Sequence, residues 1–342
     1  MDRYQQAFLY FAEKEARGSS RLYECLSKEV VNDEELMTLI RDIPLSQPRP
    51  NLFFAAMQYL LKKYDAPLRA YYASLTDSPL SAEEAFLPFR DFALQHQVEL
   101  RELFHTKLVQ TNEVRRAAYL YPLIADIHQS CNKPLALMEI GTSAGLLLGL
   151  DHYNYEYLNG PSIHSATDAL TICSENRGER LPSSILKKPV IHTRIGLDLH
   201  LIDLKKEDDL EWMLALIWPE HEERRRQFIK ATEVNDSIRK EVYEGDAVAL
   251  LPRIISTIPE ECQLVVFHTH VANQFPQELK KQLTDTLQTI SHERSLYHVY
   301  NNMYDADIHQ DYIEHGISTS VRLLPAADAH GRWFAWRNTV ES

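Results

Sequence analysis

The chain has little that would tie it to an oxidising compartment or to a membrane. Its four cysteines are widely separated and form no C-x-x-C pair, so neither a disulfide framework nor a zinc site is indicated. No apolar run approaches the roughly 20 residues that span a bilayer. The N-terminal stretch MDRYQQAFLYFAEKEARG carries charges throughout and has no small-residue cleavage site, unlike a signal peptide. We therefore expect reduced thiols, a cytoplasmic location and no membrane partner.

Basic residues are also fewer than acidic residues. The 342 residues include 36 Lys and Arg against 49 Asp and Glu, which gives a net charge of −13. A nucleic-acid backbone is therefore not expected as the primary partner, because phosphate binding needs a basic surface. Hydrophobic residues make up 44% of the chain, enough to form the core of one large domain or two ordinary ones.

The sequence changes in character near residue 130. Before that point apolar residues recur at helical spacing, and no convincing strand precedes residue 134. After it, short apolar runs alternate with helical patterns. We predict a helical N-terminal domain over residues 1–130, followed by an α/β core over residues 131–342.

The predicted core has seven strands. They cover residues 135–140, 190–197, 241–244, 263–268, 295–300, 317–324 and 332–338. Helical patterns fit residues 143–153, 207–218, 221–233, 246–256 and 276–291. This alternation predicts a mostly parallel sheet covered on both faces. Only PAADAHG separates the last two runs, so they should form a C-terminal antiparallel hairpin at a sheet edge.

The segment Gly141-Thr142-Ser143-Ala144-Gly145 follows the first predicted strand. It fits a turn whose backbone amides hold a nucleotide-like cofactor. It also fits the G-x-S-x-G nucleophile elbow of a serine hydrolase, with Ser143 as nucleophile and Asp246 and His330 as later partners. A third interpretation is a plain tight turn with glycines for close packing. The cofactor turn is favoured, because no strand or oxyanion loop precedes residue 134.

Three carboxylates follow predicted strands. Glu139 ends the first, Asp198 the second and Asp246 the third. Ligands of open α/β sheets bind beyond the carboxyl ends of the strands. Carboxylates there can accept hydrogen bonds from ribose hydroxyls or an adenine amino group. Alternatively, Asp198 and Asp246 only cap the helices that follow them.

His268 and His270 stand at spacing two, so in a strand both would point to one face. His268 is the candidate general base, because an imidazole titrates near neutral pH. A metal site that adds Glu139 or Asp198 is not favoured, since no third ligand has a diagnostic spacing. We therefore expect no metal.

A polar segment precedes the first predicted strand. Thr111 or Asn112 is the expected N-cap of a helix, and Glu113 and Arg116 share one face of that helix. The segment either only caps the helix or also offers polar groups to cofactor or substrate. With His270, these four residues form the candidate pocket set.

Taken together, these motifs resemble the seven-strand S-adenosylmethionine-dependent methyltransferases, through Glu139 to Gly145 and through Gly245-Asp246-Ala247. The chain more closely resembles a bacterial family of unknown function built on that core. The residues that carry the closer resemblance are Gln110–Glu113 with Arg116, Glu139–Leu146, Arg194–Asp198, Leu216–Pro219 with Arg224, Gly245–Ala247, Val266–His268 and His330–Trp333.

The resemblance implies a seven-strand Rossmann-like methyltransferase core preceded by a helical domain. It also implies S-adenosylmethionine as cofactor, bound by Glu139, Gly141, Thr142, Ser143, Gly145, Asp198, Asp246 and Ala247. Ser143 stands where the methyltransferase loop has a third glycine. Asp198 follows the turn at more than the roughly 20 residues usual in such units, which predicts an insertion over about 154–190 with a short β-excursion around Leu170–Cys173.

The expected function is therefore S-adenosylmethionine binding and methyl transfer to a small or medium acceptor. One alternative is a serine hydrolase that uses Ser143. Another is a non-catalytic binding module that keeps the methyltransferase-like core. The sequence leaves the acceptor and the oligomeric state open.

Overall fold

The computed structural model describes residues 2–110, 112–165 and 168–338. The chain forms two compact units. The helical unit comprises Met1–Thr111 and Asp203–Arg226, and the α/β unit comprises Asn112–Ile202 and Gln227–Ser342. This division differs from the predicted boundary at residue 130 for two reasons. Helix α7 (Ala117–Cys131) packs within the α/β unit, and a later segment completes the helical unit.

The helical unit is built around α4 (Arg49–Lys63), in which 11 of the 15 residues are buried. Side chains of Asp2, Ser20 and Asp33 cap three of its helices. No strand occurs among the described residues before Leu135, as predicted. The remaining elements are α1 (Arg3–Tyr10), η1 (Phe11–Ala16), α2 (Arg21–Val30), α3 (Glu34–Ile40), η2 (Pro67–Tyr71), η3 (Ala82–Glu84), α5 (Phe86–Gln95), α6 (Gln97–Thr106), α8 (Glu207–Ala215) and the first turn of α9 (Glu222–Asp236).

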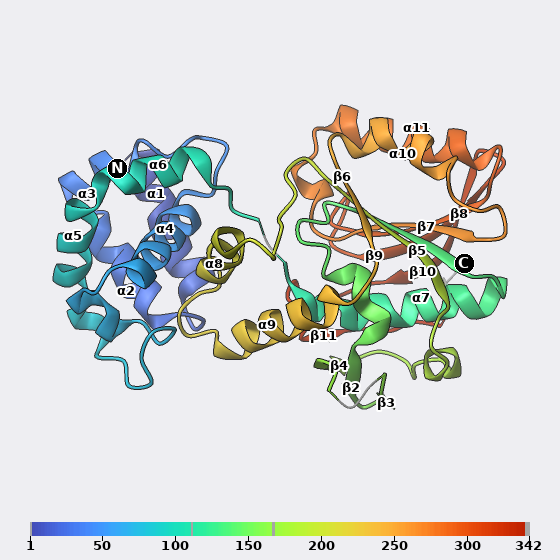
Figure 1. The fold of residues 1–342 in the computed structure, drawn as a ribbon, viewed down its shortest axis with the longest axis horizontal. Helices are drawn as coiled ribbons and strands as arrows, with labels where there is room; N and C mark the ends of the chain where they lie inside the picture. Colours follow the sequence, from blue (N-terminus) through green and yellow to red (C-terminus); the bar gives the residue numbers. More distant parts are fainter. Residues whose placement is uncertain (1, 111, 166–167, 339–342) are drawn as a thin grey trace. The chain divides into compact units, whose positions relative to one another are not determined.

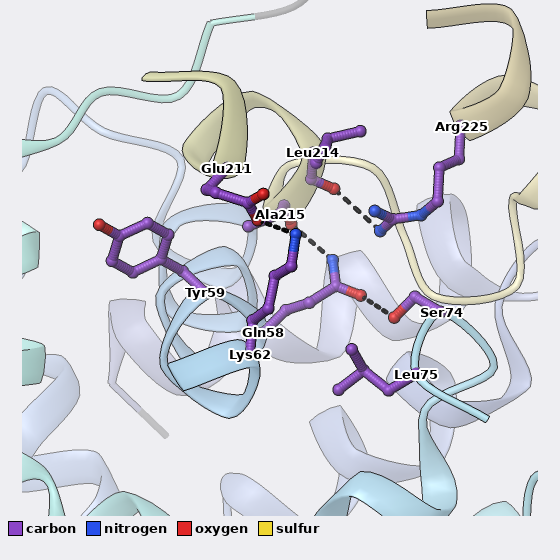
Figure 2. A pocket seen from close by; sticks show the side chains of 9 residues that line it. All are labelled: Gln58, Tyr59, Lys62, Ser74, Leu75, Glu211, Leu214, Ala215 and Arg225. Carbon is purple, nitrogen blue, oxygen red and sulfur yellow. Dashed lines mark hydrogen bonds and ion pairs between the residues drawn. The ribbon is translucent and has the colours of Figure 1, made fainter. Parts of the chain in front are cut away.

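The buried side chain of Gln58, in α4, forms hydrogen bonds with the segment Asp203–Arg226. The Gln58 amide donates to the carbonyl oxygens of Ala215 (2.7 Å) and Ile217 (2.8 Å), and Ser74 donates to its oxygen at 2.6 Å. Figure 2 shows this junction, with Lys62 paired to Glu211 beside it. The cavity there measures about 20 Å³, which is room for a single water. It is therefore a packing junction.

The α/β unit contains a seven-strand sheet in the order β10-β9-β8-β7-β1-β5-β6. Five strands are parallel, and their spatial order, numbered along the chain, is 3-2-1-4-5, as in doubly wound α/β folds. The strands are β1 (Leu135–Ile140), β5 (Ile191–Asp198), β6 (Glu241–Glu244), β7 (Gln263–His268), β8 (Leu296–Asn301), β9 (Ile308–Glu314) and β10 (Ile317–Leu324).

The antiparallel hairpin at the sheet edge exists, but its strands differ from the prediction. It pairs β9 with β10, and residues 332–338 do not take part. Sequence analysis missed β9. The turn that joins the two strands consists of His315 (φ 51°) and Gly316 (φ 79°), two positive-φ residues typical of a two-residue hairpin loop.

Residues within the range predicted as an insertion form most of a second sheet. Its strands are β2 (Asn154–Leu158), β3 (Ser162–Ile163), β4 (Thr171–Asn176) and the C-terminal β11 (Trp333–Phe334), which pairs in parallel with β4. The helix predicted over 143–153 is instead a short 3₁₀ helix, η5 (Leu147–His152). A further 3₁₀ helix, η6 (Ser183–Leu186), precedes β5.

Helices cover both faces of the main sheet (Figure 1). α10 (Ala247–Ile255) and α11 (Gln277–Ser291) lie on one face and α7 on the other. Ala136, Met138 and Ile140 of β1 belong to the core beneath α10 and α11. Because strand side chains alternate, Glu139 points to the α7 face.

Helix α7 is buried almost all round. On the side of the second sheet, Tyr121 stacks on Tyr155 at 4.6 Å, and Tyr157 donates to the Ala118 carbonyl at 2.9 Å. Helices predicted over 207–218, 221–233, 246–256 and 276–291 are confirmed as α8 to α11.

Candidate functional site

The carboxyl edge of β1 is the topological switch point of the main sheet. The chain proceeds from β1 to β5 and β6 on one side, and then crosses to β7 and β8 on the other. Ligands of open α/β sheets bind at such points. Glu139, the penultimate residue of β1, lies between Gly196 of β5 and Phe267 of β7, and the glycine turn follows Ile140.

The turn after β1 has three residues with positive φ: Gly141 (74°), Ser143 (50°) and Gly145 (69°). A Cβ atom added to Gly141 would lie 2.7 Å from a Val271 methyl carbon, so close packing alone requires glycine there. Ser143 adopts the left-handed conformation that glycine tolerates best.

The amides of this turn donate largely within the protein. Those of Gly141 and Thr142 donate to the Leu197 carbonyl, at 2.8 and 3.2 Å, and that of Gly145 donates to the Thr142 carbonyl at 2.7 Å. The Ser143 amide donates to Asp198 at 2.7 Å. Only the Ala144 amide has no acceptor among the described residues. A ligand held by this turn would therefore rely on the neighbouring carboxylates more than on backbone amides.

Glu139 is the most unusual ionisable group of this edge. Its side chain is buried, and one oxygen accepts a 2.7 Å hydrogen bond from the Thr142 hydroxyl. Burial raises the pKa of Glu139 to about 8, and the charge of Asp198 acts in the same direction. Among the described residues no Lys or Arg forms an ion pair with it. Buried carboxyls with strongly raised pKa values concentrate at functional sites.

Of the two aspartates that sequence analysis considered as helix caps, only Asp246 caps a helix, because α8 begins at Glu207 and Asp198 binds turn amides instead. Asp198 accepts from the amides of Ser143 and, at 3.0 Å, His200. Asp246 caps α10 by accepting from the Val248 amide at 2.9 Å, and Ala247 is the first residue of that helix. Each carboxylate oxygen has two acceptor positions, so these bonds leave capacity for a ligand.

The Ser143 hydroxyl is buried and accepts a 2.7 Å hydrogen bond from the Asn112 amide. A nucleophilic serine needs a base within hydrogen-bond reach. Among the described residues no histidine bonds to this hydroxyl. His330, the histidine considered for a triad, bonds to Glu113 and not to Asp246.

His268 ends β7 at this edge, but its side chain points to the α10–α11 face, opposite to Glu139. Its side chain has no exposed surface, and its Nε2 atom is 3.1 Å from Nε2 of His298. Burial lowers the pKa of His268 to about 3. A substrate bound at the Glu139 face would have no direct access to His268, because its side chain is fully buried and lies on the opposite face of the sheet.

His270 does not share a face with His268, because β7 ends at His268 and His270 has φ 56°. The His270 amide donates to Asn301 at 3.0 Å, and its ring lies 3.2 Å from the Asn302 amide nitrogen. Burial lowers the pKa of His270 to about 3, with smaller contributions from Arg116 and His330. The structure therefore groups His270 with the predicted Glu113–Arg116 segment.

Within that segment the N-cap differs from the prediction. Glu113 caps η4 (Val114–Arg116), a 3₁₀ turn that leads into α7, by accepting from the Arg115 amide. Thr111 lies outside the described residues. Arg116 is buried and donates to the Ala329 carbonyl at 2.9 Å.

Two parts of the edge were not predicted as site residues. Lys240 donates to the carbonyls of Ala144 and Gly145, at 3.1 and 3.3 Å, and so supports the glycine turn. The loop over residues 327–332 contacts the Glu113–Arg116 segment. This loop contains the sequence Asp328-Ala329-His330-Gly331. The aspartate and the glycine on either side of the histidine indicate a tight turn, and this pattern could have drawn attention to His330 as a site residue.

No helix among the described residues is long and apolar enough to cross a membrane. The same residues contain no group of three or more His, Cys, Asp or Glu side chains that could hold a metal ion. The model of a family described as "Uncharacterized protein conserved in bacteria (DUF2332)" matches residues 5–336. No curated protein and no solved structure matches the chain.

Proposed function

We propose that this chain, which belongs to the DUF2332 family of bacterial proteins, binds S-adenosylmethionine and transfers its methyl group to a small or medium acceptor. The observation that carries the proposal is the buried Glu139 carboxyl, which bonds to Thr142 and forms no ion pair among the described residues, at the switch point of a 3-2-1-4-5 sheet. Burying such a group without a counter-ion costs stability, and a cationic ligand at this edge would offset that cost.

The residues of the edge fit this cofactor. S-adenosylmethionine carries a sulfonium and an amino group, both cationic, and the carboxylates of Asp198 and Asp246 make the edge acidic. Asp198 ends β5 and Asp246 follows the neighbouring parallel strand β6, where they would accept from the ribose and the adenine. The bound cofactor would supply an electrophilic methyl group, and the protein would contribute positioning and exclusion of water.

Asp198 offers the sharpest binding test. We expect Asp198→Asn to weaken the affinity for S-adenosylhomocysteine by roughly 10- to 100-fold. A carboxylate bonded to ribose hydroxyls contributes about 1.5–3 kcal/mol, and about 1.4 kcal/mol is tenfold. The asparagine oxygen can still accept from one of the two amides that Asp198 now binds. Isothermal titration calorimetry measures the affinity, and a melting curve of each variant reports folding.

The matched control is Asp285→Asn, which removes an exposed carboxylate of α11 that pairs with Lys281. It should leave the affinity unchanged. If Asp198→Asn binds S-adenosylhomocysteine as tightly as the parent chain while losing stability, Asp198 only holds the backbone amides of Ser143 and His200. Absence of binding by the parent chain itself would refute the proposed function.

The serine hydrolase remains the second candidate, because Ser143 combines a G-x-S-x-G sequence with φ 50° immediately after a buried strand. We expect no labelling of Ser143 by a fluorophosphonate probe, since its hydroxyl bonds to Asn112. Labelling of the parent chain that disappears in Ser143→Ala would reverse the order of the two candidates.

The same position yields a stability prediction. Ser143→Gly should be more stable than Ser143→Ala by about 1 kcal/mol, because both lose the Asn112 hydrogen bond and only glycine relieves the left-handed backbone. Chemical denaturation of the two variants measures the difference. Equal stabilities would show that Ser143 carries no backbone strain.

A further inference from the structure

A half-exposed histidine is backed by a buried carboxylate close to the candidate cofactor edge. Nδ1 of His330 lies 2.9 Å from Oε2 of Glu113, although the two residues are 217 positions apart in the sequence. The His330 side chain is 48% exposed, whereas that of Glu113 is 3% exposed. Because a carboxylate can only accept, this contact places a proton on Nδ1 and leaves the Nε2 lone pair available.

The loop that carries His330 is tightly held. Asp328 accepts from the His330 amide at 3.1 Å and forms a bidentate pair with Arg332. Gly331 has φ 71°, and a Cβ atom there would lie 2.5 Å from the Arg115 carbonyl oxygen. These contacts fix the backbone on both sides of His330. An exposed imidazole on a rigid loop is suited to acid–base catalysis, because the ring does not have to be repositioned before it reacts.

The Glu113–His330 pair adjoins the glycine turn through the 112–116 segment. Asn112, next to Glu113 in the chain, bonds to the Ser143 hydroxyl of the turn. Burial dominates the pKa shifts of both Glu139 and His270, and the charge of Arg116 lowers the pKa of each. The pair and the candidate cofactor edge are therefore neighbours within one unit.

We propose that His330, held by Glu113, is the general base that removes a proton from the methyl acceptor. This inference rests on the proposed methyl transfer. The acceptor is then a molecule with a weakly acidic O–H or N–H group. That bond breaks, its electron pair stays on the oxygen or nitrogen, and the proton moves to Nε2 of His330. Glu113 balances the charge of the resulting imidazolium, which returns the proton to water through its exposed face.

The first test reads the tautomer directly and needs neither cofactor nor acceptor. In the full-length protein with ¹⁵N-labelled histidine, long-range ¹H–¹⁵N spectra at pH 8 should show His330 protonated on Nδ1 and not on Nε2. His330→Gln assigns the signals, and Glu113→Gln should shift the ring toward the Nε2–H tautomer that free histidine favours. An Nε2–H tautomer in the parent chain would overturn the proposal.

The second test measures turnover with p-cresol and benzylamine as probe acceptors, by release of S-adenosylhomocysteine. His330→Gln should lower kcat by 10²- to 10⁴-fold, the range of general-base catalysis, with the affinity for S-adenosylhomocysteine unchanged. The control His105→Gln, at an exposed position of α6, should have no effect.

The outcomes separate the two proposals. If the parent chain does not bind S-adenosylhomocysteine, the proposed cofactor is refuted. The tautomer of His330 measured in the first test is not affected by that result. Binding without turnover of any probe contradicts the proposed acceptor class and favours the non-catalytic module. Turnover that His330→Gln does not reduce assigns the base elsewhere.

Discussion

Glu139→Gln is expected to stabilise the protein by about 3 kcal/mol at pH 7. Burial raises the pKa of Glu139 to about 8 from an ordinary 4.5. Between these values the folded state keeps a proton that the unfolded state releases, so stability falls as the pH rises from 4.5 to 8. At about 1.36 kcal/mol per pH unit, most of this cost is already present at pH 7. Glutamine removes it, and its amide oxygen can still accept from Thr142.

Urea unfolding at pH 4.5, 6, 7 and 8.5 measures the effect. The difference between variant and parent should be small at pH 4.5 and should increase up to pH 8. Glu293→Gln, which removes an exposed glutamate of the same unit, should show no such trend. A difference that does not depend on pH would mean that Glu139 is ionised in the folded protein at no cost.

Acid should destabilise the same unit through a second buried group. The His268 pKa is lowered to about 3 by burial, and that of His298 is lowered well below 6.5 by burial and by its neighbour His268. Unfolded histidine titrates near 6.5. Below that pH the unfolded chain binds protons that the folded chain excludes, so stability is lost from pH 6.5 down toward pH 3. His268 alone should account for about 2 kcal/mol between pH 7 and pH 5.

A double substitution tests this explanation. His268→Leu with His298→Leu replaces both hydrogen-bonding partners by apolar groups and should remove most of the loss between pH 7 and pH 5. Each single substitution should cost about 1–3 kcal/mol at pH 7, because it leaves the other ring unsatisfied. His164→Gln, at an exposed position, is the control. A double variant with the acid sensitivity of the parent would contradict the assignment.

Much of the α/β topology could be predicted from sequence, because buried parallel strands are short apolar runs separated by helical patterns. The strands predicted over 135–140 and 263–268 have the same bounds as β1 and β7 in the structure. The strand β9 was missed because IHQDYIE mixes polar and apolar residues, as an antiparallel strand near a sheet edge does. The partner of β11 could not be predicted, since pairing with β4 depends on a tertiary contact.

The site residues at strand ends could be predicted from the sequence. The contacts between residues that are far apart in the sequence could not. Glu139, Asp198 and Asp246 were located because the carboxyl ends of parallel strands share one edge. The roles expected for His268 and His330 depended on which carboxylate or histidine each would meet. A separation of 217 residues between Glu113 and His330 leaves no local pattern from which to infer their contact.

The interrupted helical unit has a consequence for synthesis on the ribosome. Its first part ends at Thr111, but its second part, Asp203–Arg226, emerges only after the first two parallel strands of the α/β unit. Until then the Gln58 amide lacks the carbonyls of Ala215 and Ile217, and the buried surface of α4 remains partly uncovered. The N-terminal helices therefore complete their folding late, and neither unit can be encoded as a contiguous segment of the gene.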